Sequence, residues 1–330
     1  MKALQIALRL VLLAGVLSFA GYLYLAYAPA GDGGAHPFNQ DRNAVWLEHR
    51  WLERAHPEAE MEALFTGLRG HGIAYAYPHI IPFNGAGRLP VHDRDQLRAF
   101  LAAARKVAPE MKVLPWVGGL RKGFRRQRPG TIDLNDLSQR QRMVAECRGL
   151  IDEGFDGVHL NVEPIPNGDV EFLSLLRALR VAVGGALLSV SATRPGPVAI
   201  PVAPNFFWTR GYYERVGAVA DQLVVMSYDT ALPTPPLYRR YLAYVGRSTI
   251  RTLAGQGRAR ILVGIPTYDS SGLMHREDVE NPENALLGLV AGLRGEGGGG
   301  TLEGVALYAE WTTDEREWAT YERLWRNAGR

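Results

Sequence analysis

Short apolar segments alternate with longer amphipathic segments along almost the whole chain, and this alternation most restricts the fold. Eight segments have the length and the nearly continuous apolar composition of strands that are buried on both faces of a parallel sheet. They are residues 44–47, 73–78, 113–117, 157–162, 187–192, 223–228, 261–266 and 304–308. Eight further segments place apolar residues at the three- and four-residue steps of a helix. They are residues 58–68, 95–107, 138–151, 169–183, 212–219, 238–253, 284–293 and 313–324.

Eight strand–helix units within about 290 residues predict one α/β domain, a closed (β/α)8 TIM barrel over residues 44–330. The segments that follow the predicted strands are long, as at 80–94, 118–137, 194–210 and 269–283. In such barrels these loops build the active site. An open doubly wound sheet is the main alternative, but no glycine-rich phosphate loop follows a predicted strand. We also expect Thr312 and Glu315 to form a capping box and Gly184 to end a helix.

The N-terminus carries an apolar run of 19 residues, 10–28, without a charge. It is long enough to cross a bilayer, and Lys2 and Arg9 before it orient the remaining chain away from the cytoplasm. We therefore expect residues 1–30 to be a signal anchor and 31–43 a short linker, with the barrel periplasmic or extracellular. The alternative is a signal peptide cleaved near Ala30 and a secreted barrel.

Composition and charge exclude several other classes. Without Lys2 and Arg9, the 37 basic residues fall to 35 against 34 acidic ones, and this balance gives no indication of a nucleic-acid partner. The single cysteine, Cys147, excludes a disulfide framework and a multi-cysteine metal site. We expect a monomer without a cofactor or a metal.

The segment 154–164, GFDGVHLNVEP, is the most informative part of the chain. Alternation along a strand places His159, Asn161 and Glu163 on one face, which must be the barrel interior. Burying polar groups in a row costs several kcal/mol unless they are hydrogen-bonded, and an active site is where such a cost is tolerated. Glu163, at the end of the strand, is a candidate general acid, because burial would raise the pKa of its carboxyl group.

This segment resembles the D-G-x-D-x-D-x-E signature on the fourth strand of glycoside hydrolase family 18, the chitinase-like barrels. Asp156, Gly157 and Glu163 match that signature.

Three other segments agree with the resemblance, which spans residues 44–327. Residues 225–229, VMSYD, are similar to the family's M-x-Y-D motif on strand six. Residues 112–119, KVLPWVGG, are similar to its third strand, and Trp311 falls where the family keeps a tryptophan under the sugar.

The resemblance implies substrate-assisted, retaining hydrolysis of a polysaccharide or oligosaccharide that contains a β-linked N-acetylhexosamine. Glu163 would protonate the leaving oxygen while the substrate's own acetamido oxygen attacks the anomeric carbon. Tyr228 and Asp229 would orient the acetamido group, and Trp311 would stack on the sugar. Asp156 and His159 are further candidate substrate contacts. Trp116, Trp208, Tyr268 and Tyr308 are further candidate aromatic platforms, but each could equally be a core residue that closes the barrel mouth.

The chain departs from the family at two positions. His159 and Asn161 stand where the signature has its middle aspartates, and the second aspartate normally holds the acetamido nitrogen. Asparagine two residues before glutamate, however, resembles the N-x-E pair of the family 85 endo-β-N-acetylglucosaminidases, in which asparagine takes that role. An inactive barrel that binds carbohydrate therefore stays open as an alternative.

Two other sites are considered. His49, His79 and His159 could form a metal site with Glu163 or Asp229, as in a metal-dependent hydrolase, but no His-x-His or His-Glu-x-x-His pattern supports it. A basic run at 121–128 is a solvated loop, a contact for lipid headgroups near the anchor, or a site for an anionic glycan. In the last case its candidate ligands are Arg121 and Arg125.

Overall fold

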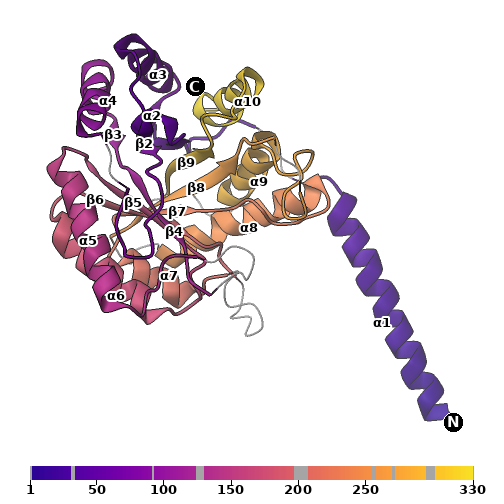
Figure 1. The fold of residues 1–330 in the computed structure, drawn as a ribbon. Helices are drawn as coiled ribbons and strands as arrows, with labels where there is room; N and C mark the ends of the chain where they lie inside the picture. Colours follow the sequence, from indigo (N-terminus) through magenta and orange to yellow (C-terminus); the bar gives the residue numbers. More distant parts are fainter. Residues whose placement is uncertain are drawn as a thin grey trace.

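The computed structural model describes residues 2–30, 34–90, 93–123, 130–196, 207–253, 258–269, 272–294 and 302–329 (Figure 1). Among them, nine parallel strands form one curled sheet in the order β3-β2-β1-β9-β8-β7-β6-β5-β4. The strands are β1 (Asn43–Leu47), β2 (Ile73–Pro78), β3 (Lys112–Val113), β4 (Trp116–Leu120), β5 (Gly157–Glu163), β6 (Leu187–Ala192), β7 (Gln222–Val225), β8 (Arg260–Pro266) and β9 (Leu302–Tyr308). All eight segments predicted as strands lie in this sheet.

The third predicted strand is split into β3 and β4, which only Leu114 and Pro115 separate. Pro115 cannot donate a main-chain hydrogen bond, so an interruption is favoured there. β3 pairs with β2, while β4 pairs with β5. His79, directly after β2, also forms a parallel bridge with Trp116 in β4. The two ends of the sheet therefore meet through one interrupted strand, consistent with an eight-unit (β/α)8 barrel.

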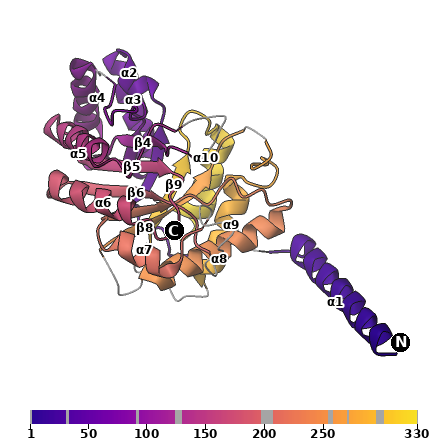
Figure 2. The ribbon, with the colours of Figure 1, turned by 60° about the horizontal axis from the view of Figure 1, so that its bottom comes forward.

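Helices surround this sheet (Figures 1 and 2). They are α2 (Arg50–Glu53), α3 (Glu58–Gly70), α4 (Arg94–Val107), α5 (Leu137–Asp152), α6 (Val170–Val183), α7 (Arg210–Gly217), α8 (Pro235–Leu253), α9 (Pro282–Arg294) and α10 (Glu315–Tyr321), and a π-helical turn follows at Glu322–Arg326. Each helix predicted from periodicity is present with shifted ends, whereas α2 was not predicted. Because each helix starts after a strand, the helix N-termini lie at the C-terminal end of the barrel.

Of the two predicted helix termini, the end at Gly184 is confirmed and the capping box of Thr312 and Glu315 is wrong. Gly184 ends α6 with a φ of 60°, a left-handed conformation that suits glycine. The capping box before α10 is formed by Asp314 and Glu317, not by Thr312 and Glu315. The Thr312 hydroxyl instead donates to a main-chain carbonyl of the preceding loop, so the helix begins later.

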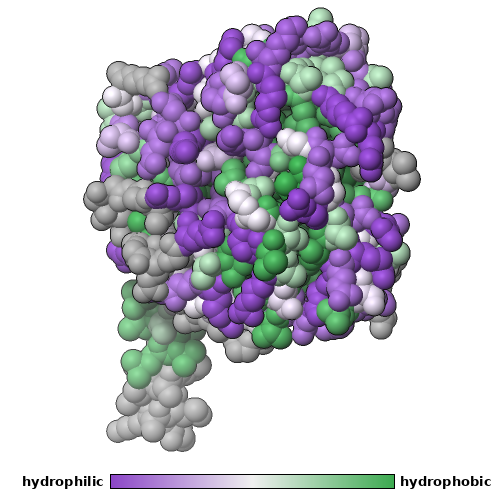
Figure 3. All heavy atoms as spheres, turned by 90° about the vertical axis from the view of Figure 1, so that its left-hand side faces the viewer, coloured by the Kyte–Doolittle hydropathy of each residue, from purple (hydrophilic) through white to green (hydrophobic). Residues whose placement is uncertain are grey.

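The apolar N-terminus forms α1 (Lys2–Tyr27), which extends away from the barrel (Figures 1 and 2). Its segment Leu10–Tyr27 is long and apolar enough to cross a membrane, a property that a signal sequence shares. Figure 3 shows the hydrophobic surface of this helix beside the mainly hydrophilic outer surface of the barrel.

The second half of the predicted linker belongs to the barrel. His36 and Phe38 are buried, and His36 Nε2 lies 2.9 Å from the carbonyl oxygen of Leu324 near the C-terminus. The second half of the segment that we expect to be a short linker, 31–43, is therefore packed on the barrel.

Candidate active site

The interior of the barrel contains a hydrogen-bonded polar network around His159. His159 is fully buried; its Nδ1 lies 2.8 Å from Ser189 Oγ, and its Nε2 accepts from Trp46 Nε1 at 3.1 Å. Ser189 Oγ donates onward to Gln222 Oε1, so its oxygen accepts a hydrogen bond from the Nδ1–H group of the imidazole. Burial lowers the pKa of His159 to about 3 and keeps the ring neutral. The predicted inward polar face of β5 is confirmed at this residue, but its burial leaves it no surface for substrate.

Asp156 lies at the opposite end of β5 from Glu163. The seven residues of β5 rise about 3.3 Å each and separate the two carboxyl groups along the barrel. Asp156 instead accepts hydrogen bonds from Arg105 at 2.8 Å and from the main-chain N–H of Val113 at 2.9 Å. The expectation that Asp156 contacts substrate beside Glu163 is therefore wrong, and its observed role is to tie together neighbouring units of the barrel.

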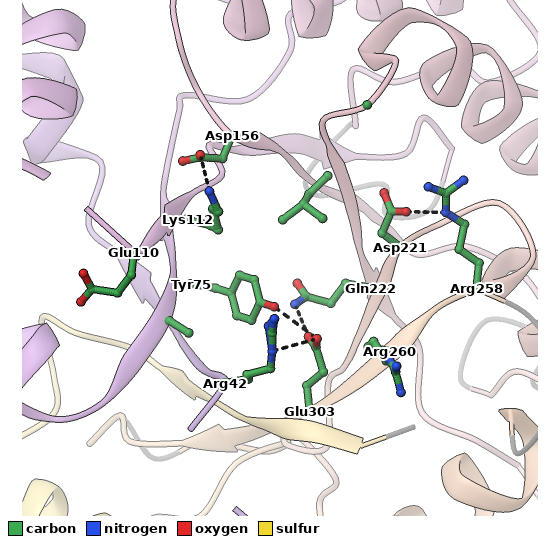
Figure 4. Close-up of a pocket in the computed structure, with 13 residues that line it drawn as sticks. Arg42, Tyr75, Glu110, Lys112, Asp156, Asp221, Gln222, Arg258, Arg260 and Glu303 are labelled. Atoms are coloured by element: carbon green, nitrogen blue, oxygen red, sulfur yellow. Dashed lines mark hydrogen bonds and ion pairs between the residues drawn. The ribbon is translucent and has the colours of Figure 1, made fainter. Parts of the chain in front are cut away.

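The cavity around Asp156 is large, about 540 Å³, and is lined by charged side chains (Figure 4). Six of these charges neutralise one another in three pairs. Lys112 faces Asp156 at 3.3 Å, Arg258 faces Asp221 at 2.5 Å, and Arg42 faces Glu303 at 3.6 Å. We assign this cavity a structural role at the N-terminal end of the barrel.

A second cavity, of about 190 Å³, lies at the C-terminal ends of β4 and β5, where a barrel of this type carries its active site. It is lined by His79, Pro82, Trp116, Gly118, Gly119, Leu120, Asn161 and Glu163. The Trp116 ring forms one wall and stacks on His79 at 4.0 Å. Burial and the neighbouring His49 lower the pKa of His79 to about 4, so this wall is uncharged at neutral pH.

Gly118 and Gly119 line this cavity, and Gly118 allows the two strands to approach closely. Gly118 pairs with Asn161 across β4 and β5, and its φ of 151° is unfavourable for other residues. A Cβ atom on Gly118 would lie 1.8 Å from the main-chain oxygen of Asn161. The close approach of β4 to β5 beside Glu163 therefore requires glycine at this position.

Asn161 presents an unused hydrogen-bond acceptor at the cavity. Its Oδ1 atom is buried and has no partner among the described residues. An unpaired buried acceptor costs about 1–3 kcal/mol, which a ligand N–H could recover. Asn161 therefore offers a free acceptor for an N–H group of a ligand in this cavity.

An aromatic cluster lies beside Glu163, with Tyr308 at its centre. Tyr308 stacks on Tyr228 at 5.2 Å and meets the rings of Trp116 and Trp311 edge-on. Burial, and next the negative charge of Glu163, raise the pKa of Tyr308 to about 12. Burial, Tyr308 and Glu163 likewise raise the pKa of Tyr228. Both phenols are therefore protonated donors close to the Glu163 carboxylate.

Of the predicted aromatic platforms, Trp311 and Tyr308 belong to this cluster and Trp208 does not. Trp311 is 40% exposed at the rim, while Tyr308 lies beneath it. Trp208 is fully buried elsewhere and donates to the carbonyl oxygen of Ile165 at 2.9 Å, so it is a packing residue.

Asp229 lies in the loop after β7 and is held by residues of the loops that follow β6 and β8. Tyr268 donates to Asp229 Oδ1 at 2.5 Å, and Arg194 donates to the Asp229 main-chain oxygen at 3.1 Å. His275 stacks under Tyr268 at 3.9 Å and lies 3.5 Å from the buried Glu280. The sequence did not single out Arg194, His275 or Glu280, because they occur in loops without a motif or a periodicity.

The candidate ligands for an anionic glycan, Arg121 and Arg125, are not among the described side chains that the structure brings together around Glu163. The guanidinium group of Arg121 pairs with Asp169, and Arg125 lies outside the described residues. Within the described parts of the chain, no three His, Cys, Asp or Glu side chains come close enough to bind a metal ion.

Comparisons with known proteins bear on the fold. No protein-family model and no curated protein sequence matches this chain. Among solved structures, a chitinase from Chromobacterium violaceum has a TM-score of 0.58 and 17% identity, over 86% of this chain and 98% of that chain. The spore cortex-lytic enzyme SleL of Bacillus cereus has a TM-score of 0.56 and 10% identity, over 87% of this chain and 75% of that chain. A family GH18 chitinase from C. violaceum has a TM-score of 0.56 and 17% identity, over 89% of this chain and 87% of that chain. The chain therefore has the barrel fold of the family 18 chitinases and of SleL.

Proposed function

We propose that the chain is a glycoside hydrolase that cleaves a β-linked, N-acetylhexosamine-containing glycan with Glu163 as general acid and base. One observation carries this proposal. The unpaired Oδ1 of Asn161 is buried in the same cavity as Glu163, two residues away on β5, where it would accept the N–H of an acetamido group.

The proposed reaction uses the substrate's acetamido oxygen as the nucleophile. Glu163 gives its proton to the departing glycosidic oxygen while that nucleophile bonds to the anomeric carbon. The carboxylate of Glu163 then takes a proton from the water that opens the cyclic intermediate. Asn161 orients the N–H but cannot remove its proton, so the intermediate stays cationic and the charges of Glu163 and Asp229 balance it.

The neighbouring residues have matching roles in this proposal. Tyr228 donates to the acetamido oxygen and Asp229 supports the distorted sugar. Tyr308, Trp116 and Trp311 supply the apolar surface on which sugar rings stack. The sequence left Tyr308 open as a platform or a core residue, and its place beside Glu163 supports a part in this surface.

The comparisons support the same class of reaction. The structures with this fold include chitinases and a spore cortex-lytic enzyme. We propose a membrane-anchored monomer with the barrel outside the cytoplasm, acting on chitin-like or peptidoglycan-like chains. The alternative is a barrel that binds such chains without cleaving them, which the replacement of the family's aspartate by Asn161 favours.

The proposal is tested on the full chain in detergent with chitin oligomers and peptidoglycan glycan strands. The wild type is expected to release reducing ends, and a thiazoline mimic of the cyclised intermediate is expected to inhibit it. Glu163→Gln should abolish release while retaining oligosaccharide binding. Glu110→Gln is the matched control, because Glu110 is exposed and lies at the other end of the barrel. Equal binding by the wild type and Glu163→Gln without cleavage by either would establish the binding-only alternative.

A further inference from the structure

The last turn of α1 is attached to the start of α8. Thr234 Oγ1 donates to the carbonyl oxygen of Ala26 at 2.6 Å, and Arg240 Nη1 donates to that of Ala28 at 3.0 Å. Ala26 is fully buried by this contact. The carbonyl groups at a helix C-terminus lack partners within the helix, and cationic donors there also offset the helix dipole. The end of α1 is therefore held on the barrel surface.

This attachment lies at the end of the barrel that carries the candidate active site. α8 follows β7, and so does Asp229; the next loop, after β8, carries Tyr268. The two loops are joined, since Ala231 N donates to the carbonyl oxygen of Met274 at 2.8 Å. Figures 1 and 2 both show α1 leaving beside one end of α8.

Two large apolar side chains are exposed on the joined loops. Leu273 is 98% exposed and Met274 is 42% exposed. Arg276 in the same loop donates to the carbonyl oxygen of Pro233 at 3.3 Å, which holds this loop against the residues that contact α1. Exposed apolar side chains next to an arginine, here Arg276, are typical of surfaces that lie in the headgroup region of a bilayer.

The distance between this surface and the predicted membrane span is short. The span ends at Tyr27, and the contact between Ala26 and Thr234 leaves no linker between them. If α1 crosses a bilayer, Thr234 lies at the bilayer surface. A free tether would instead allow the barrel to turn in any direction.

We propose that the rim formed by residues 231–240 and 272–276 rests on the lipid surface of the bilayer that α1 spans. The partner is the headgroup and upper acyl region of the membrane, into which Leu273 and Met274 insert. The loops that carry Asp229 and Tyr268 then lie close to the membrane, so the site meets glycan chains near the bilayer. This inference rests on the proposed anchoring by α1 and does not require hydrolysis.

The test uses the full chain in phosphatidylcholine–phosphatidylglycerol vesicles that contain a lipid with a nitroxide quencher near its headgroup. A fluorophore is attached at Leu273→Cys or, as a matched control, at Val181→Cys. Val181 is also apolar, is 83% exposed, and lies near the end of α6 at the opposite end of the barrel. The native Cys147 does not compete for the label, because it is buried and burial raises its pKa to about 12.

Fluorescence at position 273 is expected to be quenched several-fold more strongly than at position 181. Thr234→Val removes the hydrogen bond to Ala26, and we expect it to reduce this difference. Equal quenching at the two positions, or no association of the full chain with vesicles, would show that the proposal is wrong. If the full chain shows this quenching but releases no reducing ends, the membrane contact is supported and the proposed hydrolysis is wrong.

Discussion

Gly118 and Asn161 face each other on β4 and β5, and a Cβ atom at residue 118 would lie 1.8 Å from the main-chain oxygen of Asn161. The main chain fixes the position of a Cβ atom, and its neighbour here is a main-chain oxygen, so no side-chain rotation relieves this contact. The position of Asn161, and of Glu163 two residues further on, therefore depends on the absence of a side chain on the neighbouring strand.

Gly118→Ala is expected to lower the free energy of unfolding by about 3 kcal/mol or more, because β4 must move away from β5. It should also abolish activity. Gly67→Ala is the control: nothing lies within 4 Å of a Cβ atom there, and Gly67 is inside α3, so stability should rise by about 0.5–1 kcal/mol. Urea unfolding of both variants measures the difference. A Gly118→Ala protein as stable as the wild type would contradict the close approach of the two strands.

Asn161→Ala is expected to lower kcat/KM about 10²–10³-fold, the usual cost of removing one group that binds the reacting centre. Asn161→Asp should be faster than Asn161→Ala, because a carboxylate both accepts the acetamido N–H and balances the positive charge of the intermediate. Its pH–rate profile should gain a second ionisation, since the new carboxyl group titrates together with Glu163. Steady-state kinetics on one N-acetylated oligomer compare the three proteins. Unchanged kcat/KM in Asn161→Ala would remove the acetamido contact from the proposal.

His159 is expected to make the protein sensitive to acid. Its folded-state pKa of about 3 lies below the ordinary value of 6.5 because the ring is buried. The unfolded chain therefore binds a proton below pH 6.5 while the folded chain does not. The free energy of unfolding should fall with decreasing pH by up to about 1.4 kcal/mol per unit from this residue, until the pH reaches its folded-state pKa.

The check is a comparison with His159→Gln, which keeps polar atoms in the barrel but does not titrate. This variant should be less stable at pH 7, because it cannot reproduce the bonds to Trp46 and Ser189. Its stability should nevertheless fall less steeply between pH 6 and pH 4. Parallel slopes for the two proteins would show that His159 does not contribute to acid unfolding.

The sequence was sufficient to predict the order of strands and helices and the inward polar face of β5. Apolar periodicity and strand alternation, on which those predictions depend, are local properties. It was insufficient where a residue's partner is far along the chain. Arg121 is 48 residues from Asp169, and only the assembled sheet shows that the two form an ion pair. Asp156 was misplaced for a related reason: it belongs to the same motif as Glu163, but the length of β5 puts the two at opposite ends of the barrel.

Tyr268 is expected to act by positioning Asp229. Tyr268→Phe removes the hydroxyl group that donates to Asp229 Oδ1 but keeps the ring that stacks on His275. A lost hydrogen bond to a charged group is worth about 1.5–3 kcal/mol, so kcat should fall about 10- to 100-fold with little change in KM. Tyr24→Phe is a matched control, because Tyr24 is exposed on α1 and far from the site. A rise in KM without a fall in kcat would instead place the Tyr268 hydroxyl group in direct contact with the bound sugar.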